Sequence, residues 1–108
     1  MDKREARRLY KEKKIPMGIF AVRCSASGEA WVGPSRHLDT ERNGLWFQLR
    51  LGTHLNKRMQ ESWNANGEAA FEYEILETLK DDISPLLIKD TLAERQKHWI
   101  SELKAALL

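Results

Sequence analysis

Two short apolar segments joined by a turn of small residues constrain the fold of this chain more than any other feature of its sequence. Residues 17–23 (Met-Gly-Ile-Phe-Ala-Val-Arg) and residues 29–33 (Glu-Ala-Trp-Val-Gly) are rich in strand-forming side chains. The segment between them, residues 25–28, consists of serine, alanine and glycine, which suits a turn. Because a loop this short can only join antiparallel neighbours, the sequence predicts a β-hairpin here.

Helical spacing follows the hairpin. Apolar side chains over residues 38–49 predict a helix, which we expect to be kinked or divided at Asn43–Gly44 because glycine is unfavourable inside a helix by about 1 kcal/mol relative to alanine. Gly52 then indicates a helix stop, and Thr53 the N-cap of the next helix. That second helix is predicted from apolar residues that recur on one face: Leu55, Met59 and Trp63.

A third strand and a last helix complete the predicted order. Residues 71–77 alternate apolar and mainly acidic side chains, as a strand with one buried face does. Helical periodicity returns over residues 86–108. The expected fold class is therefore α+β, with a small three-stranded antiparallel sheet flanked by helices. We divide the chain into a basic N-terminal segment, residues 1–15, and one domain, residues 16–108.

Composition excludes several classes of protein. No apolar run approaches the roughly 20 residues of a membrane-spanning helix. The single cysteine, Cys24, excludes a disulfide framework, and with only three histidines it excludes a zinc site of the usual Cys/His spacing. We therefore expect a cytoplasmic protein with no membrane partner.

Charge is divided unevenly along the chain. Residues 1–58 carry 13 Lys and Arg against 6 Asp and Glu, whereas residues 59–108 carry 5 against 10. A basic half attracts polyanions such as nucleic acids even when the formal net charge is only +2. The alternative is that both halves carry ordinary solvated helix surfaces, and charge alone does not decide between the two.

Six short motifs occur in order between residues 16 and 104. They are Gly18-Ile19-Phe20, Trp31-Val32-Gly33, Gly52-x-His54, Asn64-x-x-Gly67, the strand from Phe71 to Glu77, and Glu94-Arg95-Gln96-x-x-Trp99-Ile100. Each motif is weak alone, but in this order and spacing they resemble the GIY-YIG nuclease superfamily. The resemblance implies the same small antiparallel sheet flanked by helices. It also implies cleavage of phosphodiester bonds with one divalent metal, Mg²⁺ or Mn²⁺.

The family's chemistry, as the resemblance implies it, uses two tyrosines, an arginine, a histidine and a metal-binding glutamate. Here Phe20 and Trp31 stand at the tyrosine positions, Glu41 at the arginine position and Gln96 at the glutamate position, while His54 is kept. Phe20 has no hydroxyl and Trp31 offers only an N–H donor. A neutral amide such as that of Gln96 is a poor ligand for Mg²⁺, which prefers carboxylate oxygens.

Other residues are candidates for the missing roles. Arg42 replaces the arginine only if its helix is distorted, because a one-residue offset turns a helical side chain by about 100°. His54 is the second catalytic candidate, and Glu94 a candidate metal ligand. We expect a further set of residues to contact the phosphate backbone of nucleic acid: Arg36, Arg42, Arg50, Asn56, Lys57 and Arg58.

These observations predict a GIY-YIG-like domain that binds nucleic acid, DNA or RNA, through its phosphate backbone, with a weak or lost hydrolytic site. One alternative is an active metal-dependent endonuclease with a rearranged site built from Arg42, His54 and Glu94. The other is a protein-interaction module that retains only the fold. An exposed pair, Trp46 and Phe47, is a possible surface for a protein partner.

Overall fold

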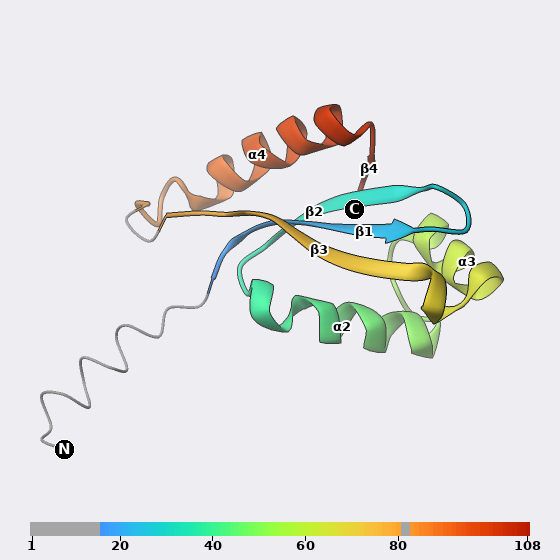
Figure 1. Ribbon diagram of the computed structural model, residues 1–108. Helices are drawn as coiled ribbons and strands as arrows, with labels where there is room; N and C mark the ends of the chain where they lie inside the picture. Colours follow the sequence, from blue (N-terminus) through green and yellow to red (C-terminus); the bar gives the residue numbers. More distant parts are fainter. Residues whose placement is uncertain (1–15, 81–82) are drawn as a thin grey trace, which may run out of the picture.

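A four-stranded sheet forms the centre of the protein, with helices on both of its faces (Figure 1). The computed structural model describes residues 16–80 and 83–108. The strands lie in the order β3-β1-β2-β4, with bounds Gly18–Cys24 for β1, Ala30–Ser35 for β2, Phe71–Thr78 for β3 and Ala106–Leu107 for β4. β1 pairs antiparallel with both β2 and β3. The α+β class and the three-stranded antiparallel sheet predicted from the sequence are confirmed.

Within residues 16–80 and 83–108, three α-helices cover the sheet. α2 (Leu38–Leu51) and α3 (Lys57–Asn66) lie on one face and α4 (Ile88–Leu103) on the other, while a short 3₁₀ turn, η1 (Glu68–Ala70), leads into β3 (Figure 1). Phe20 and Val22 of β1 belong to the core beneath α2 and α3, whereas Ile19 and Ala21 belong to the core beneath α4. Because both faces of β1 are covered, its residues 18–22 form an unbroken apolar run that only Arg23 ends.

A bulge in β3 turns Glu77 toward α4. Phe20 of β1 pairs with Ile75, but its neighbour Ile19 pairs with Glu77, so that Leu76 is an extra residue. The Glu77 carboxylate accepts hydrogen bonds from Arg95 Nε at 2.8 and 3.0 Å and from Trp99 Nε1 at 2.9 Å. These contacts fasten α4 to the edge of the sheet.

Glu77→Gln should therefore lower the free energy of unfolding by about 1–2 kcal/mol at neutral pH, since hydrogen bonds to a charged group are the stronger kind. Burial alone would raise the pKa of Glu77, but the hydrogen bonds from Trp99 and Arg95 outweigh it and hold this pKa below its usual 4.5. The pKa of Glu77 is thus lower in the folded than in the unfolded state. The stabilisation that the Glu77 carboxylate provides is therefore lost as the pH falls through the folded-state pKa. Urea unfolding should show that Glu77→Gln and wild type differ less in their free energy of unfolding at pH 3 than at pH 7. Glu102→Gln, at an exposed position of α4, should change little at either pH.

Two local predictions about α2 and α3 were wrong. α2 runs without interruption through Asn43–Gly44, because the packing of Leu45, Leu49 and other residues holds the whole helix against the sheet. The N-cap of α3 is Asn56 rather than Thr53, and its side-chain oxygen accepts a hydrogen bond from the Met59 N–H at 3.1 Å. His54 therefore lies in a loop before the helix.

The last helix is also shorter than predicted. It ends at Leu103, where Lys104 adopts a left-handed conformation (φ 52°), instead of continuing to Leu108. The following residues form β4, which pairs parallel with β2 at Trp31 and Val32. This fourth strand is missing from the sequence prediction.

The expected exposed pair on α2 is only half correct. Trp46 is buried in the core against Trp63, with their ring centroids 5.6 Å apart, while Phe47 is 62% exposed. No helix in the described part of the chain is both long and apolar enough to cross a membrane. The predicted basic segment, residues 1–15, lies outside the described residues.

Candidate functional site

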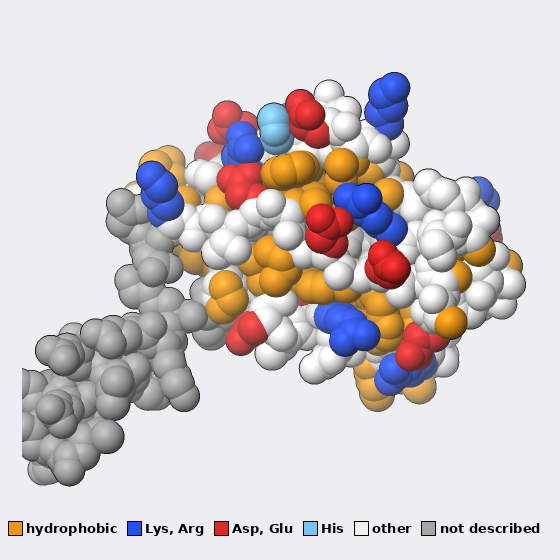
Figure 2. Space-filling view, in the orientation of Figure 1, with side chains coloured by type: hydrophobic (Ala, Val, Ile, Leu, Met, Phe, Trp, Pro, Cys, Tyr) orange, Lys and Arg blue, Asp and Glu red, His pale blue; other side chains and the backbone are white. Residues whose placement is uncertain are grey.

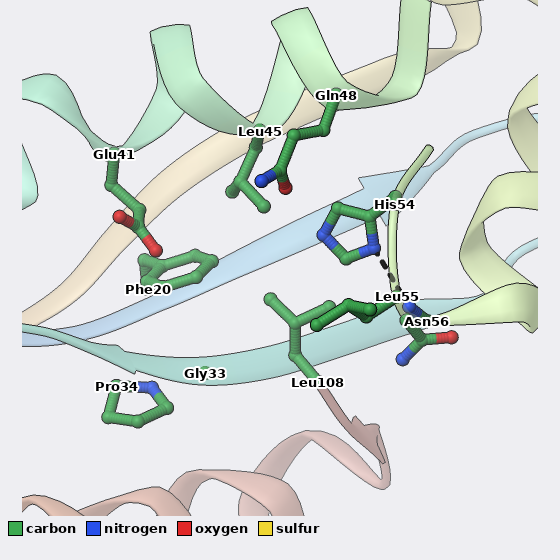
Figure 3. A pocket seen from close by; sticks show the side chains of 10 residues that line it. All are labelled: Phe20, Gly33, Pro34, Glu41, Leu45, Gln48, His54, Leu55, Asn56 and Leu108. Atoms are coloured by element: carbon green, nitrogen blue, oxygen red, sulfur yellow. Dashed lines mark hydrogen bonds between the residues drawn. The ribbon is translucent and has the colours of Figure 1, made fainter. Parts of the chain in front are cut away.

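A cleft of about 310 Å³ opens between α2, the end of β2 and the loop before α3 (Figure 3). Apolar side chains and one glycine form much of its lining: Phe20, Gly33, Leu45 and Leu108. Its polar residues come from α2 and from the loop: Glu41, Gln48, His54 and Asn56. The cleft thus brings together three positions that the sequence motifs indicate, those of Phe20, Glu41 and His54.

The floor of the cleft offers no titratable group. Phe20 is 1% exposed and cannot exchange a proton. Gly33 allows the side chains of Leu108 and Phe20 to approach the backbone of β2 closely. A Cβ at this position would lie 2.9 Å from Leu108 Cδ2 and 3.0 Å from Phe20 Cζ. The Leu108 N–H donates to Val32 O at 3.0 Å, and its side chain extends toward the cleft beside Gly33 (Figure 3).

A tyrosine packs behind Phe20 without replacing the missing hydroxyl. The rings of Tyr73 and Phe20 stack with centroids 5.3 Å apart. The Tyr73 hydroxyl donates to Leu38 O at 3.1 Å, which directs its proton to the start of α2. Burial and the nearby charges of Glu41 and Asp39 raise the pKa of Tyr73 to about 12. Tyr73 therefore stays protonated at neutral pH and serves the packing of α2.

His54 presents one ring nitrogen to the cleft. Its Nδ1 accepts a hydrogen bond from the Asn56 N–H at 3.0 Å, and this contact requires the lone pair of Nδ1 (Figure 3). The proton of neutral His54 is therefore on Nε2. The His54 N–H donates to Gln60 Oε1 at 3.2 Å, while Gln60 Nε2 donates to Leu49 O at 2.9 Å, so the loop is tied to the end of α2. The arrangement suits donation of a hydrogen bond to an anionic oxygen in the cleft.

Burial lowers the pKa of His54 below its usual 6.5. We expect a histidine NMR titration to give a midpoint below 6.5 for this residue and long-range nitrogen–proton correlations to place its proton on Nε2. The variant His54→Gln lacks this imidazole ring, so the signal that disappears in its spectrum is that of His54. A midpoint at or above 6.5, or a proton on Nδ1, would contradict the observed loop geometry.

Glu41, and not Arg42, faces the cleft. Both lie on α2, and since the helix is continuous their side chains diverge by about 100°. The Arg42 guanidinium lies over the Trp46 ring, 5.4 Å from its centroid, and Arg42 does not line the cleft. Glu41 is half-buried and contacts His37 Nδ1 at 3.2 Å. Burial raises the pKa of Glu41, although the charge of His37 and a hydrogen bond from Ser35 oppose this effect.

The residues present do not fit the metal that the resemblance implies. The Gln96 side chain is 8% exposed, and its Nε2 donates to Val32 O at 2.9 Å. Glu94 is exposed on α4 and lines neither the cleft nor any other pocket found among the described residues. Within residues 16–80 and 83–108, no group of three or more His, Cys, Asp or Glu side chains is placed to hold a metal ion.

The predicted phosphate contacts are distributed over several surfaces. Arg50 pairs with Glu68 at 2.6 Å and Arg58 with Glu29 at 2.8 Å, and both arginines are largely exposed. Exposed pairs of this kind are weak because solvent and salt screen them, so a phosphate can replace the carboxylate. On the face shown in Figure 2, Lys and Arg side chains alternate with Asp and Glu around an apolar centre, and no continuous basic patch forms there.

The remaining predicted contacts lie nearer to the two ends of the cleft. Asn56 lines the cleft and caps α3, and its Nδ2 donates to Leu107 O at 3.4 Å. Lys57 is exposed at the first turn of the same helix, and Arg36 is exposed directly after β2. The roles of these residues, like those of Arg42, His54 and Glu94, stay predictions.

Sequence reasoning missed two residues of the cleft. Gln48 shares a helix face with Glu41 at i+7, so the helical period could have found it. Leu108 reaches the cleft only because the chain leaves α4 and pairs with β2. No local pattern in the sequence indicates that turn.

Two solved structures are similar to this chain over most of its length. One is the catalytic domain of the homing endonuclease I-TevI, with 25% identity and a TM-score of 0.71, covering 85% of this chain and 97% of that domain. The other is a point mutant of the catalytic domain of the intron endonuclease I-TevI, with 27% identity and a TM-score of 0.70, covering 83% of this chain and 86% of the other. The chain has the fold of the GIY-YIG nucleases. The sequence matches no family model, and no curated protein is significantly similar to it.

The GIY-YIG fold gives the two motif glycines a structural meaning. Gly18 begins β1 beside the bulge at Glu77, and Gly33 admits Phe20 and Leu108 to the floor of the cleft. Neither role depends on hydrolysis. Both glycines thus serve the close packing of the fold.

Proposed function

We propose that this GIY-YIG-fold domain binds the phosphate backbone of nucleic acid and does not hydrolyse it efficiently. The observation that carries the proposal is the content of the cleft. Phe20 and Glu41 line it where the family has a tyrosine and an arginine, and Gln96 uses its amide to bind Val32 O. Removal of single electrostatic groups of this kind typically costs several kcal/mol of transition-state stabilisation.

Binding is supported by the nuclease-like fold and by groups suited to phosphate. The similar solved structures are catalytic domains of endonucleases. His54 carries its proton on the nitrogen that faces the cleft, and exposed arginines stand on α2 and α3. Arginine forks match phosphate oxygens in a bidentate fashion, so nucleic acid is the ligand class that these groups favour.

A rearranged nuclease site is less well supported. Of its three candidate residues, only His54 lines the cleft, while Arg42 lies over Trp46 and Glu94 is exposed on α4. A protein-interaction role has one observation in its favour, because Phe47 and Leu51 form an exposed apolar pair one turn apart on α2. Nothing on the molecule identifies a partner for that pair.

The test is binding and cleavage of labelled single- and double-stranded DNA and RNA. We expect fluorescence anisotropy to report binding that weakens steeply between 50 and 200 mM salt, as phosphate contacts require. With Mg²⁺ or Mn²⁺ we expect no product above that of a mock preparation. Metal-dependent product that is lost in both His54→Ala and Glu94→Ala would establish the rearranged nuclease instead. Absence of binding to any of the four substrates would favour the protein-interaction role.

A further inference from the structure

A second pocket, of about 400 Å³, adjoins the cleft through Pro34, which lines both. It lies between the end of β2 and the first half of α4, and we call it the β2–α4 pocket. Besides Pro34, it is lined by Ser35, Arg36, Lys89, Leu92, Ala93 and Gln96. Two of these side chains are cations, and none of the described residues that line the pocket is Asp or Glu.

The positions of these residues follow from two regular elements. Lys89, Ala93 and Gln96 lie at i, i+4 and i+7 on α4, so they share one face of the helix. Arg36 comes directly after Ser35, the last residue of β2. Arg36 and Lys89 are exposed and Gln96 is buried. The pocket is thus lined by two solvated cations and by the amide of a largely buried residue.

Gln96 has an unused hydrogen-bond acceptor. Its side chain is 8% exposed, and its Nε2 is fixed as a donor by the carbonyl of Val32 at 2.9 Å. No described residue donates a hydrogen bond to its Oε1. Gln96 lines the pocket, so this oxygen is open to water or to a ligand that can donate a hydrogen bond. The amide thus adds a polar group to the pocket beside the two cations.

We propose that the β2–α4 pocket binds a phosphate group of nucleic acid through Arg36 and Lys89, without a divalent metal. The inference rests on the proposed function and assigns its phosphate site. The resemblance implies a metal-binding glutamate at the position of neutral Gln96, and two cations line the same pocket as Gln96. The cations supply the positive charge that a bound metal would otherwise bring to the phosphate. In RNA, the 2′-hydroxyl of an adjoining sugar can donate to the Oε1 of Gln96.

The central experiment measures oligonucleotide binding by anisotropy in EDTA and in Mg²⁺. It uses the full chain as wild type, as the double variant Arg36→Ala/Lys89→Ala, and as Lys97→Ala, an exposed lysine of α4 that does not line the pocket. We expect wild type to bind at least as tightly in EDTA as in Mg²⁺. The double variant should bind at least tenfold more weakly at 50 mM salt, with a salt slope smaller by about two. Lys97→Ala should change affinity by less than twofold.

Two results would overturn the proposal while leaving the proposed function intact. One is binding by wild type that requires Mg²⁺. The other is a double variant that binds no worse than Lys97→Ala, which would place the phosphate contacts elsewhere. Circular dichroism of each variant distinguishes lost contacts from lost folding.

A measurement without nucleic acid keeps the two proposals separate. Titration of the ¹⁵N-labelled protein with inorganic phosphate in EDTA, against sodium chloride of matched ionic strength, should shift the side-chain amide of Gln96 and the backbone amide of Ala93. The double variant should show no such shift. If wild type binds no oligonucleotide but shows these shifts, the proposed function fails and the pocket stands. If phosphate shifts neither signal, the pocket assignment is wrong.

Discussion

Gly18→Ala should destabilise this domain by about 3 kcal/mol or more, because the added methyl group has no space. A Cβ on Gly18 would collide with the carbonyl oxygen of Glu77 and lie 2.9 Å from its carbonyl carbon. Both atoms belong to the backbone of β3 at its bulge, and they cannot move without breaking the pairing with β1. Overpacking in a core costs 1–3 kcal/mol where side chains can adjust, and more where backbone must shift.

The chain contains a matched control for this substitution. Gly44 lies in the middle of α2, and a Cβ there meets no atom within 4 Å. Gly44→Ala should therefore stabilise the domain by about 0.5–1 kcal/mol through helix propensity alone. Urea unfolding followed by tryptophan fluorescence measures both changes. Equal stability of Gly18→Ala and wild type would mean that β3 does not approach β1 as closely as the bulge requires.

Periodicity was enough to predict the order of most elements. β1 and the alternation of β3 follow from strand-forming residues, and the apolar spacing of α2 and α4 follows from their buried faces. The kink expected at Gly44 was wrong because local propensity, worth about 1 kcal/mol, is outweighed by the packing of the helix on the sheet. β4 has two residues and therefore no period to recognise.

The loop that carries His54 shows how two acceptable caps compete. Thr53 and Asn56 are both good N-cap residues, and sequence alone does not rank them. In the fold, Asn56 caps α3, and its backbone N–H also binds His54 Nδ1. This choice gives His54 its tautomer and its place in the cleft. The motif predicts a histidine near the cleft, but it does not predict the tautomer of that histidine.

The candidate site was predictable only where the chain keeps the motif positions. Phe20, Glu41 and His54 line one cleft, as the spacing of the motifs implies. Whether Glu41 or Arg42 faces the cleft depends on whether α2 is distorted, and the sequence alone does not show this. Arg36 and Lys89 line the same β2–α4 pocket although they are 53 positions apart, and no local pattern reveals that they come together.

Glu41→Arg should tighten nucleic-acid binding at least tenfold at 50 mM salt, which corresponds to about 1.4 kcal/mol. Glu41 is the carboxylate that lines the cleft, and its charge repels a phosphate entering beside His54. Arginine reverses that charge and adds a fork that fits phosphate oxygens. One new phosphate contact should also increase the magnitude of the salt slope by about 0.9. Cleavage should remain absent, because Phe20 and Gln96 are unchanged.

Two control variants separate the position of the charge from its amount. Glu102→Arg makes the same change of charge at an exposed site on α4 and should tighten binding by less than threefold, since solvent and salt screen it. Glu41→Gln removes the carboxylate without adding a cation and should give an intermediate gain. Because burial raises the pKa of Glu41, acidification neutralises it early and should strengthen wild-type binding more than that of Glu41→Gln. If Glu41→Arg binds no more tightly than Glu102→Arg, the nucleic acid does not enter the cleft, and its contacts lie elsewhere on the domain.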